Sequence, residues 1–170
     1  MYWTNKHVLV CTASHCAQKG ANDVVGKLRL EIIRKGLDTK ILVNNCGTID
    51  LCDIGPNLVI YPDNIIYSGV TTKDIPDIIK HLTGGPVVER LVLSPEAPEE
   101  KRRRDFYAAA VTPDPISPAQ EFEKLATKHG FDAAWIAEQQ RRGFIARKPG
   151  EEPSGETITV TKKSRNRYGV

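Results

Sequence analysis

The chain has 170 residues and a formal net charge of +3. Hydrophobic residues make up 40% of it, enough for a packed core, but the longest apolar run, at residues 106–111, has only six residues. The sequence therefore predicts no transmembrane helix, and the lack of an apolar leader predicts a cytoplasmic protein. The charge is too small to argue for a nucleic-acid partner.

The chain begins with a predicted strand, helix and strand. An apolar run at residues 7–11 favours a strand that is buried on both faces. A helix is expected over about residues 18–35, ended by Gly36, and residues 40–43 form the next strand. These lengths are typical of a βαβ unit with parallel strands. The apolar stripe of the helix consists of Val24, Val25, Leu28 and Ile32.

A hairpin and a second helix are expected next. Residues 57–61 and 65–68 are short apolar runs joined by a proline-containing turn, which predicts antiparallel strands. A helix capped by Thr71 or Thr72 follows, and residues 87–93 form a last extended segment. The helix carries the stripe Ile75, Ile78, Ile79 and Leu82. This order of elements predicts an α/β fold, a thioredoxin-like mixed sheet covered by two helices.

The chain is expected to divide into a domain at residues 1–95 and an extension at residues 96–170. The extension is rich in proline and charge, a composition that predicts too little buried surface to fold alone. Helices are expected at residues 118–128 and 131–142 and a strand at residues 157–161, with irregular structure between them. Two interpretations stay open: an arm ordered by a partner, or a helical cap on the first domain. Acidic residues dilute the basic ones, so no nucleic-acid partner is expected.

All four cysteines lie in the first domain, in two pairs. The pattern is Cys11-x4-Cys16, a gap of 29 residues, and Cys46-x5-Cys52. Four thiolates can hold a [2Fe–2S] cluster or a structural zinc ion, and one pair can act as a redox-active dithiol. Zinc ribbons and dithiol enzymes typically use Cys-x-x-Cys, so the longer loops favour the cluster. Nearby Gly20, Gly47 and Gly55 would allow the backbone to approach it closely.

Other chemistry-bearing residues give weaker signals. His15 lies between the first two cysteines, but a loop residue explains it better than an iron ligand. Asp50 and Asp53 flank the last cysteine and are typical of turns. The sequence contains no recognisable catalytic triad, phosphate-binding loop or nucleotide fingerprint, so we expect no catalytic activity of the chain's own.

The residues around the last cysteine carry a family resemblance. The run Cys52-Asp-Ile-Gly-Pro-Asn-Leu-Val-Ile-Tyr-Pro62, together with Cys11-x4-Cys16 and the later His81-Leu-Thr-Gly-Gly-Pro86, resembles the thioredoxin-like [2Fe–2S] ferredoxins. The thioredoxin-like subunit of complex I and of related hydrogenases is similar. The resemblance covers about residues 6–93.

The resemblance implies a function and a set of ligands. It implies electron transfer through a [2Fe–2S] cluster held by Cys11, Cys16, Cys46 and Cys52, either as a free ferredoxin or as a subunit of a larger oxidoreductase. Partners would be redox proteins such as a hydrogenase or dehydrogenase complex, and homodimerisation is also implied. The alternative is a structural-zinc interaction module. One position departs from the family: three residues usually separate the last two cysteines, which would place the third ligand at Thr48.

Overall fold

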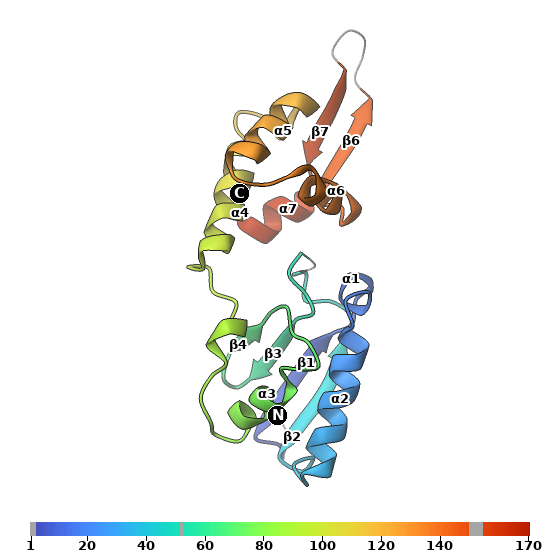
Figure 1. Ribbon diagram of the computed structural model, residues 1–170, viewed down its shortest axis with the longest axis vertical. Helices are drawn as coiled ribbons and strands as arrows, with labels where there is room; N and C mark the ends of the chain where they lie inside the picture. The colour runs from blue at the N-terminus through green and yellow to red at the C-terminus, as the bar shows by residue number, and fades with distance from the viewer. Residues whose placement is uncertain (1–2, 52, 150–154) are drawn as a thin grey trace. The chain divides into compact units, whose positions relative to one another are not determined.

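The structure is a computed structural model in which residues 3–51, 53–149 and 155–170 are described. The chain divides into two compact units, Met1–Leu93 and Ser94–Val170. Figure 1 shows both, and each is described here by itself. Within the described residues, no helix is both long and apolar enough to cross a membrane.

The first unit is built on a four-stranded mixed sheet in the order β2-β1-β3-β4. β1 runs parallel to β2 and antiparallel to β3, which forms a hairpin with β4. The predicted βαβ unit and hairpin are therefore confirmed. The strands are β1 (Lys6–Cys11), β2 (Ile41–Cys46), β3 (Leu58–Tyr61) and β4 (Ile65–Tyr67).

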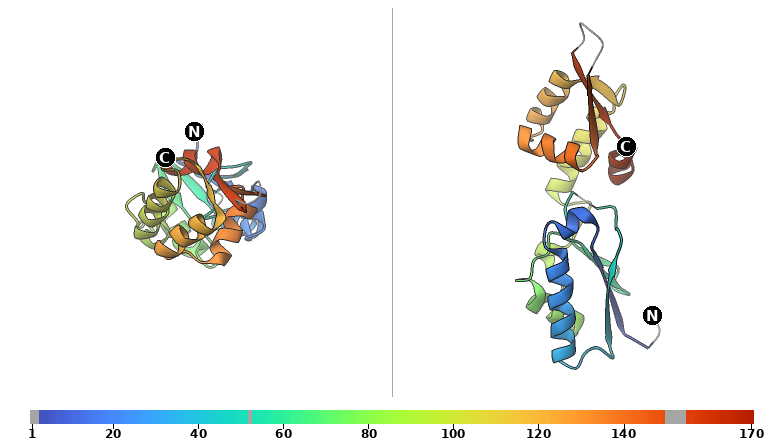
Figure 2. Two further views of the ribbon diagram at one scale, coloured as in Figure 1. Left: turned by 90° about the horizontal axis from the view of Figure 1, so that it is seen from above. Right: turned by 90° about the vertical axis from the view of Figure 1, so that its right-hand side faces the viewer.

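Two helices cover one face of this sheet (Figures 1 and 2). The predicted first helix is α2 (Ala21–Arg34) and the second is α3 (Ile75–Leu82); a short helix that was not predicted, α1 (Ser14–Ala17), precedes α2. Both predicted apolar stripes are buried against Val8, Val10, Leu58 and Ile60 of the sheet. Alternate residues of a strand face one side, so these positions form one layer of the core.

The segment after α3 differs from the prediction. Residues 87–93 were expected to be extended, but Glu89–Leu91 form a short 3-10 helix, and only Val92 bridges to Tyr67 of the sheet. The Tyr67 hydroxyl accepts a hydrogen bond of 2.9 Å from the Val88 N–H. Backbone groups in this segment thus bond to the Tyr67 side chain, to one another, and to the backbone of Ile66 and Ser68 at 2.8 Å.

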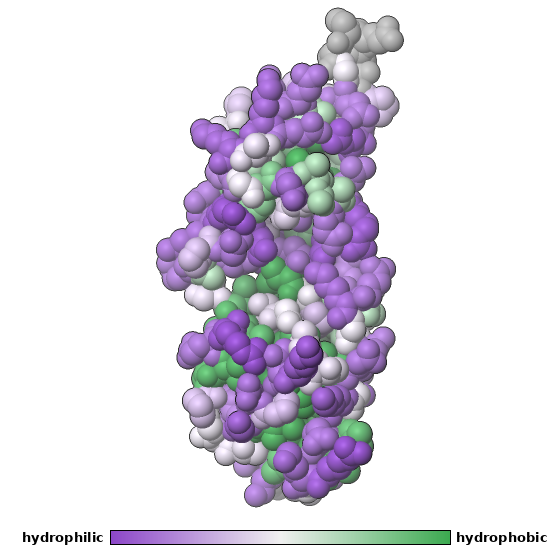
Figure 3. Space-filling view, in the orientation of Figure 1, coloured by the Kyte–Doolittle hydropathy of each residue, from purple (hydrophilic) through white to green (hydrophobic). Residues whose placement is uncertain are grey.

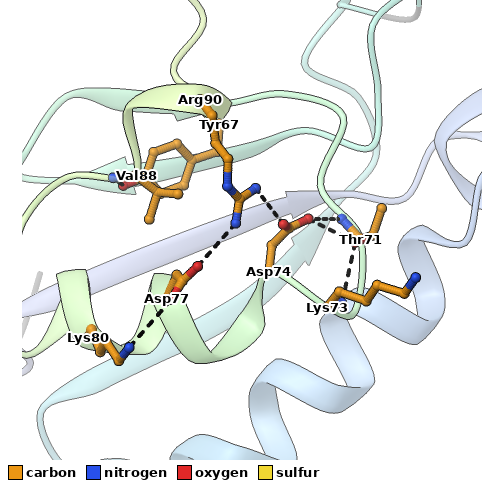
Figure 4. Close-up of polar contacts among 8 residues, drawn as sticks. All are labelled: Tyr67, Thr71, Lys73, Asp74, Asp77, Lys80, Val88 and Arg90. Carbon is orange, nitrogen blue, oxygen red and sulfur yellow. Dashed lines mark hydrogen bonds and ion pairs between the residues drawn. The ribbon is translucent and has the colours of Figure 1, made fainter.

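An ion-paired cluster joins the 3-10 helix to the start of α3 (Figure 4). The Asp74 carboxylate accepts hydrogen bonds from the Thr71 N–H at 2.7 Å and from Arg90 at 2.6 Å. Arg90 also bonds Asp77 at 3.1 Å. Asp74, not a threonine, therefore organises the start of α3. Burial raises the pKa of Asp74, but the hydrogen bonds from Thr71 and Arg90 outweigh it, and the pKa lies below its ordinary value.

Replacing Asp74 by asparagine is expected to destabilise the first unit by about 1–3 kcal/mol at neutral pH, the value of hydrogen bonds to a charged group. Because the pKa of Asp74 is lower in the folded than in the unfolded chain, its carboxylate stabilises the folded state at pH values above the unfolded-state pKa. This stabilisation is lost as the pH falls through the folded-state pKa. Urea unfolding at about pH 7 and about pH 3 should therefore show less acid sensitivity in Asp74→Asn. The more exposed Asp77→Asn is the control, and equal effects of the two changes would contradict the assignment.

The second unit contains its own sheet, of three antiparallel strands in the order β5-β7-β6. The helices predicted at 118–128 and 131–142 and the strand predicted at 157–161 are present within about two residues. Two runs rich in basic residues, 101–104 and 162–167, are helical. The elements are α4 (Pro98–Ala110), β5 (Ile116–Pro118), α5 (Ala119–Lys128), α6 (Ala133–Arg141), β6 (Ile145–Pro149), β7 (Glu156–Val160) and α7 (Lys162–Tyr168).

An aromatic cluster forms the core of this unit. Phe106 of α4 is fully buried and makes edge-to-face contacts with Phe122, Phe131 and Trp135, with ring centroids 5.3–5.4 Å apart. Tyr107 stacks on Tyr168 at 4.8 Å. Such pairs stabilise beyond the area they bury. The expectation that this segment buries too little surface to fold alone is not met, because its aromatic residues converge. Outside the cores, hydrophilic side chains dominate the visible surface (Figure 3).

Candidate functional site

Two of the four cysteines lie at the ends of neighbouring parallel strands. Cys11 ends β1, Cys46 ends β2, and the strand register pairs the two residues directly. Residues paired across a parallel ladder present their side chains on the same face. Burial raises the pKa of the Cys46 thiol, and the nearby Cys11 sulfur raises it further. Two neighbouring thiolates repel each other, and a bound cation relieves this repulsion.

The third cysteine lies on α1. Cys16 is buried and shares a small apolar cluster with Cys11 and Ala21, against which Cys46 and Ile49 pack. The structure therefore brings Cys11, Cys16 and Cys46 to one end of the first unit. Cys52 lies outside the described residues.

Gly55 packs directly against the Cys16 thiol. A Cβ atom added at Gly55 would overlap the Cys16 Sγ and lie 3.3 Å from the Asn57 Nδ2. Only glycine leaves room for this approach. At Gly47 a Cβ atom would meet no described atom within 4 Å, so the approach of this glycine to a cluster stays a prediction. Gly20 instead has a φ of +88°, a left-handed conformation that favours glycine, and precedes α2.

Asn57 ties the two cysteine-bearing segments together. Its backbone oxygen accepts a hydrogen bond of 2.9 Å from the Cys11 N–H, and its Nδ2 donates to the Leu51 oxygen at 2.7 Å. The side chain is fully buried, and its Oδ1 has no hydrogen-bond partner among the described residues. Sequence reasoning quoted Asn57 in the motif but gave it no role. A polar residue opening a buried strand is the signal that could have found it, because buried amides need partners.

The other predicted positions are more peripheral. His15 is half-buried on α1, beside Cys16. Thr48 is exposed, and its hydroxyl both donates to the Asp50 carboxylate at 3.1 Å and accepts from the Asp50 N–H at 3.0 Å. The Thr48 side chain therefore closes a local turn. Asp53 is half-buried.

The residues present fit a two-iron cluster. Among residues 3–51, 53–149 and 155–170, no three His, Cys, Asp or Glu side chains are arranged to hold a single metal ion. A [2Fe–2S] cluster needs only two thiolates per iron, so paired cysteines suit it. A cluster bound here would be surrounded by cysteine sulfurs and by glycine. Cys11 lies beside Cys46, and Gly55 packs against the Cys16 sulfur.

No family model matches the chain, but known proteins with similar sequences were found. A 2Fe-2S ferredoxin from Clostridium pasteurianum is 32% identical over 94 residues, which are 50% of this chain and 92% of that protein. A 2Fe-2S ferredoxin from Aquifex aeolicus is 35% identical over 103 residues, 55% of this chain and 93% of that protein.

The fold agrees with the sequence relatives. The crystal structure of the thioredoxin-like [2Fe-2S] ferredoxin from Aquifex aeolicus superimposes with a TM-score of 0.50 and 35% sequence identity. The match covers 54% of this chain and 98% of that one. A four-stranded mixed sheet with covering helices is thus shared with a protein of known structure. The chain belongs to the thioredoxin-like [2Fe–2S] ferredoxin family.

Proposed function

We propose that this protein transfers single electrons through a [2Fe–2S] cluster held by Cys11, Cys16, Cys46 and Cys52. The observation that carries the proposal is the register that places Cys11 beside Cys46, with buried Cys16 in the same cluster of side chains. Cys52 completes the set by its position in the sequence. When bound, the [2Fe–2S] cluster would accept and release one electron reversibly, without a substrate.

The residues around the cysteines would set the reduction potential of the cluster. The burial of Cys11 and Cys16 limits the access of water to the sulfurs, which favours the less charged oxidation state. Asn57 holds the backbone next to Cys52 through the Leu51 oxygen and so orients the loop. The partner would be another redox protein, and the chain would act as a ferredoxin or as an electron-transfer subunit of a larger oxidoreductase.

Replacing Cys46 by serine is expected to abolish cluster binding or to leave a less stable cluster with an altered visible spectrum. The serine oxygen is a harder donor than a thiolate and matches iron–sulfur chemistry poorly. Iron and acid-labile sulfide content, visible absorption and the paramagnetic spectrum of the reduced protein measure the change. Far-UV circular dichroism checks that the variant is folded.

Thr48→Ser is the matched control, because it alters a hydroxyl residue in the same loop and should leave the cluster intact. If Cys46→Ser kept an unchanged spectrum and stability, the third ligand would lie elsewhere. A colourless wild-type protein that contains one zinc ion and no sulfide would instead support the structural-zinc alternative.

A further inference from the structure

The order of elements in the second unit has a recognisable topology. Helix α4 and strand β5 precede the helix pair α5 and α6, and the β6–β7 hairpin follows the pair directly. The sheet order β5-β7-β6 places the short first strand beside the last one. This is the arrangement of a helix-turn-helix with an attached β-hairpin, or wing, in which the second helix of the pair reads DNA. Figure 1 shows α5, α6 and the hairpin together in this unit.

The connection between α5 and α6 has the geometry of a helix-turn-helix. It consists of the four residues 129–132, and Gly130 adopts a φ of +76°. The Phe131 N–H donates back to the Ala126 oxygen at 2.9 Å, which ends α5. The Asp132 carboxylate then accepts a hydrogen bond of 2.8 Å from the Trp135 N–H and caps α6. A short turn of this length with a glycine is typical of the motif.

One face of α6 is used for packing. Ile136 and Gln139 are buried, and the Gln139 oxygen accepts a hydrogen bond of 3.2 Å from the Tyr107 hydroxyl. Trp135 stacks on Phe131 with ring centroids 3.9 Å apart. The helix is therefore held rigidly by the aromatic core, as a helix that enters a groove must be.

The opposite face of α6 is exposed and has no packing role in the second unit. Its residues follow the i, i+1, i+4, i+7, i+8 spacing of one helical stripe. They are Ala133, Ala134, Ala137, Gln140 and Arg141. The three alanines let the helix backbone approach a partner closely. In the major groove a glutamine amide can pair with adenine and an arginine with guanine. Arg141 is paired with Glu138 in the free chain, at 2.7 and 2.8 Å, and would exchange this partner on binding.

Helix α5 and the hairpin border the same hollowed side. A hollow of about 510 Å³ is lined by residues of α5, α6 and β6, including Ala137 and Gln140. A second hollow, of about 580 Å³, lies between the start of α5 and the hairpin and includes Lys124. Arg147 lines both hollows, so they are adjacent. All three parts of a winged helix-turn-helix thus face one concave surface.

Two exposed lysines of α5 offer contacts for an anionic partner. Arg147 is paired with Glu123 and with Glu156, both at 2.7 Å, so it offsets one of these two negative charges. Lys124 and Lys128 are exposed on α5 and make no ion pair within residues 94–149 and 155–170. Free lysines on the helix that precedes the reading helix are well placed for phosphate contacts, which supply most of the affinity.

We infer that residues 94–170 bind double-stranded DNA, with the exposed face of α6 in the major groove and Lys124 and Lys128 on the phosphate backbone. This differs from the expectation drawn from composition, which gave no nucleic-acid partner. Net charge says little about where charged side chains lie, and Lys124 and Lys128 are exposed together on α5. The inference does not depend on the cluster in the first unit.

The test is fluorescence anisotropy of a labelled mixed-sequence duplex of about 30 base pairs, or roughly three helical turns, titrated with the full chain at low salt. The wild type should bind with a Kd at or below the micromolar range that is usual for non-specific sites. Ala137→Glu places a negative charge in the middle of the α6 face and should weaken binding roughly tenfold or more. Ala109→Glu, an exposed position on α4, is the matched control and should bind as the wild type does.

Salt dependence tests the lysines separately. Lys124→Gln combined with Lys128→Gln should weaken binding and lower the slope of log K against log salt by about 1 per lysine. Lys27→Gln combined with Lys35→Gln, which removes two exposed charges from the first unit, should leave the slope unchanged.

Three results would overturn the inference: no binding of the duplex by the folded full chain at low salt, equal losses in Ala137→Glu and Ala109→Glu, or equal affinity for single-stranded DNA. A protein that binds the α6 face of a chain without DNA affinity would also overturn it. Selection of a preferred sequence from a random duplex pool, lost in Ala137→Glu, would support it further.

Discussion

Replacing Gly55 by alanine is expected to prevent the first unit from holding the proposed cluster and to destabilise this unit by about 1–3 kcal/mol, the usual effect of overpacking. The new methyl group would overlap the Cys16 sulfur, and the Asn57 amide leaves no room on the other side. Cys16 is itself buried and cannot move aside freely. Iron content after reconstitution and denaturant unfolding of the apoprotein measure the two effects separately.

Gly47→Ala is the matched control for this change. Gly47 lies between Cys46 and Cys52, shortly before Gly55 in the chain, but a Cβ atom there meets nothing within 4 Å among the described atoms. Its stability should change by less than about 0.5 kcal/mol, as at most surface sites. Equal losses of iron in the two variants would show that the loop, rather than the contact with Cys16, requires glycine. Normal iron content in Gly55→Ala would refute the contact.

Replacing Phe106 by alanine is expected to destabilise the second unit strongly and to leave the stability of the first unchanged. Removing a fully buried phenylalanine typically costs about 3–5 kcal/mol, and a unit of this size is stabilised by only about 5–10 kcal/mol. Phe106 contacts the rings of Phe122, Phe131 and Trp135, so its loss leaves a cavity that several elements share. Calorimetry should show the transition of the second unit at a much lower temperature.

The reciprocal change tests whether the two cores are independent. Leu28→Ala removes a fully buried side chain from the first unit and should lower the stability of that unit alone. In a Trp3→Phe background, the fluorescence of Trp135 reports on the second unit and visible absorption reports on the first. If Phe106→Ala lowered both transitions together, the chain would behave as one cooperative structure.

The first unit was largely predictable from local patterns. Apolar stripes at helical spacing located α2 and α3, and short apolar runs around a turn located the hairpin. The end of β2 was not predictable: Cys46 was expected in a loop, but the strand continues through Asn44 and Asn45 to reach it. Pairing with β1 overrides the low strand propensity of asparagine, and propensity cannot anticipate such pairing.

The second unit was predicted less well than the first. The helices at residues 118–128 and 131–142 were predicted, but α4 was not, because it lies in a run of charged residues with little apolar periodicity. Only Phe106, Tyr107 and Ala110 mark its buried side together with a paired Glu100. The aromatic residues looked scattered because their contacts link segments distant in the sequence. Composition therefore predicted disorder where tertiary contacts supply a core.

The chemistry of the site stays a prediction from spacing and resemblance, and its geometry was predictable only in part. Spacing and resemblance singled out all four cysteines, and the structure brings the three described ones together. The contact of Gly55 with Cys16 and the buried amide of Asn57 could not be foreseen, because both depend on the packing of a loop against a helix from elsewhere in the chain.

The register between β1 and β2 also has a kinetic consequence. Cys11 and Cys46 are far apart in the chain and meet only when α2 has crossed over and both strands have paired along their length. Contacts of this kind form late, because the intervening chain must first be closed into a loop. The thiols of a newly made chain therefore stay separate and exposed until the sheet is complete. The iron of the proposed cluster should therefore be bound after the sheet has folded rather than by the nascent chain.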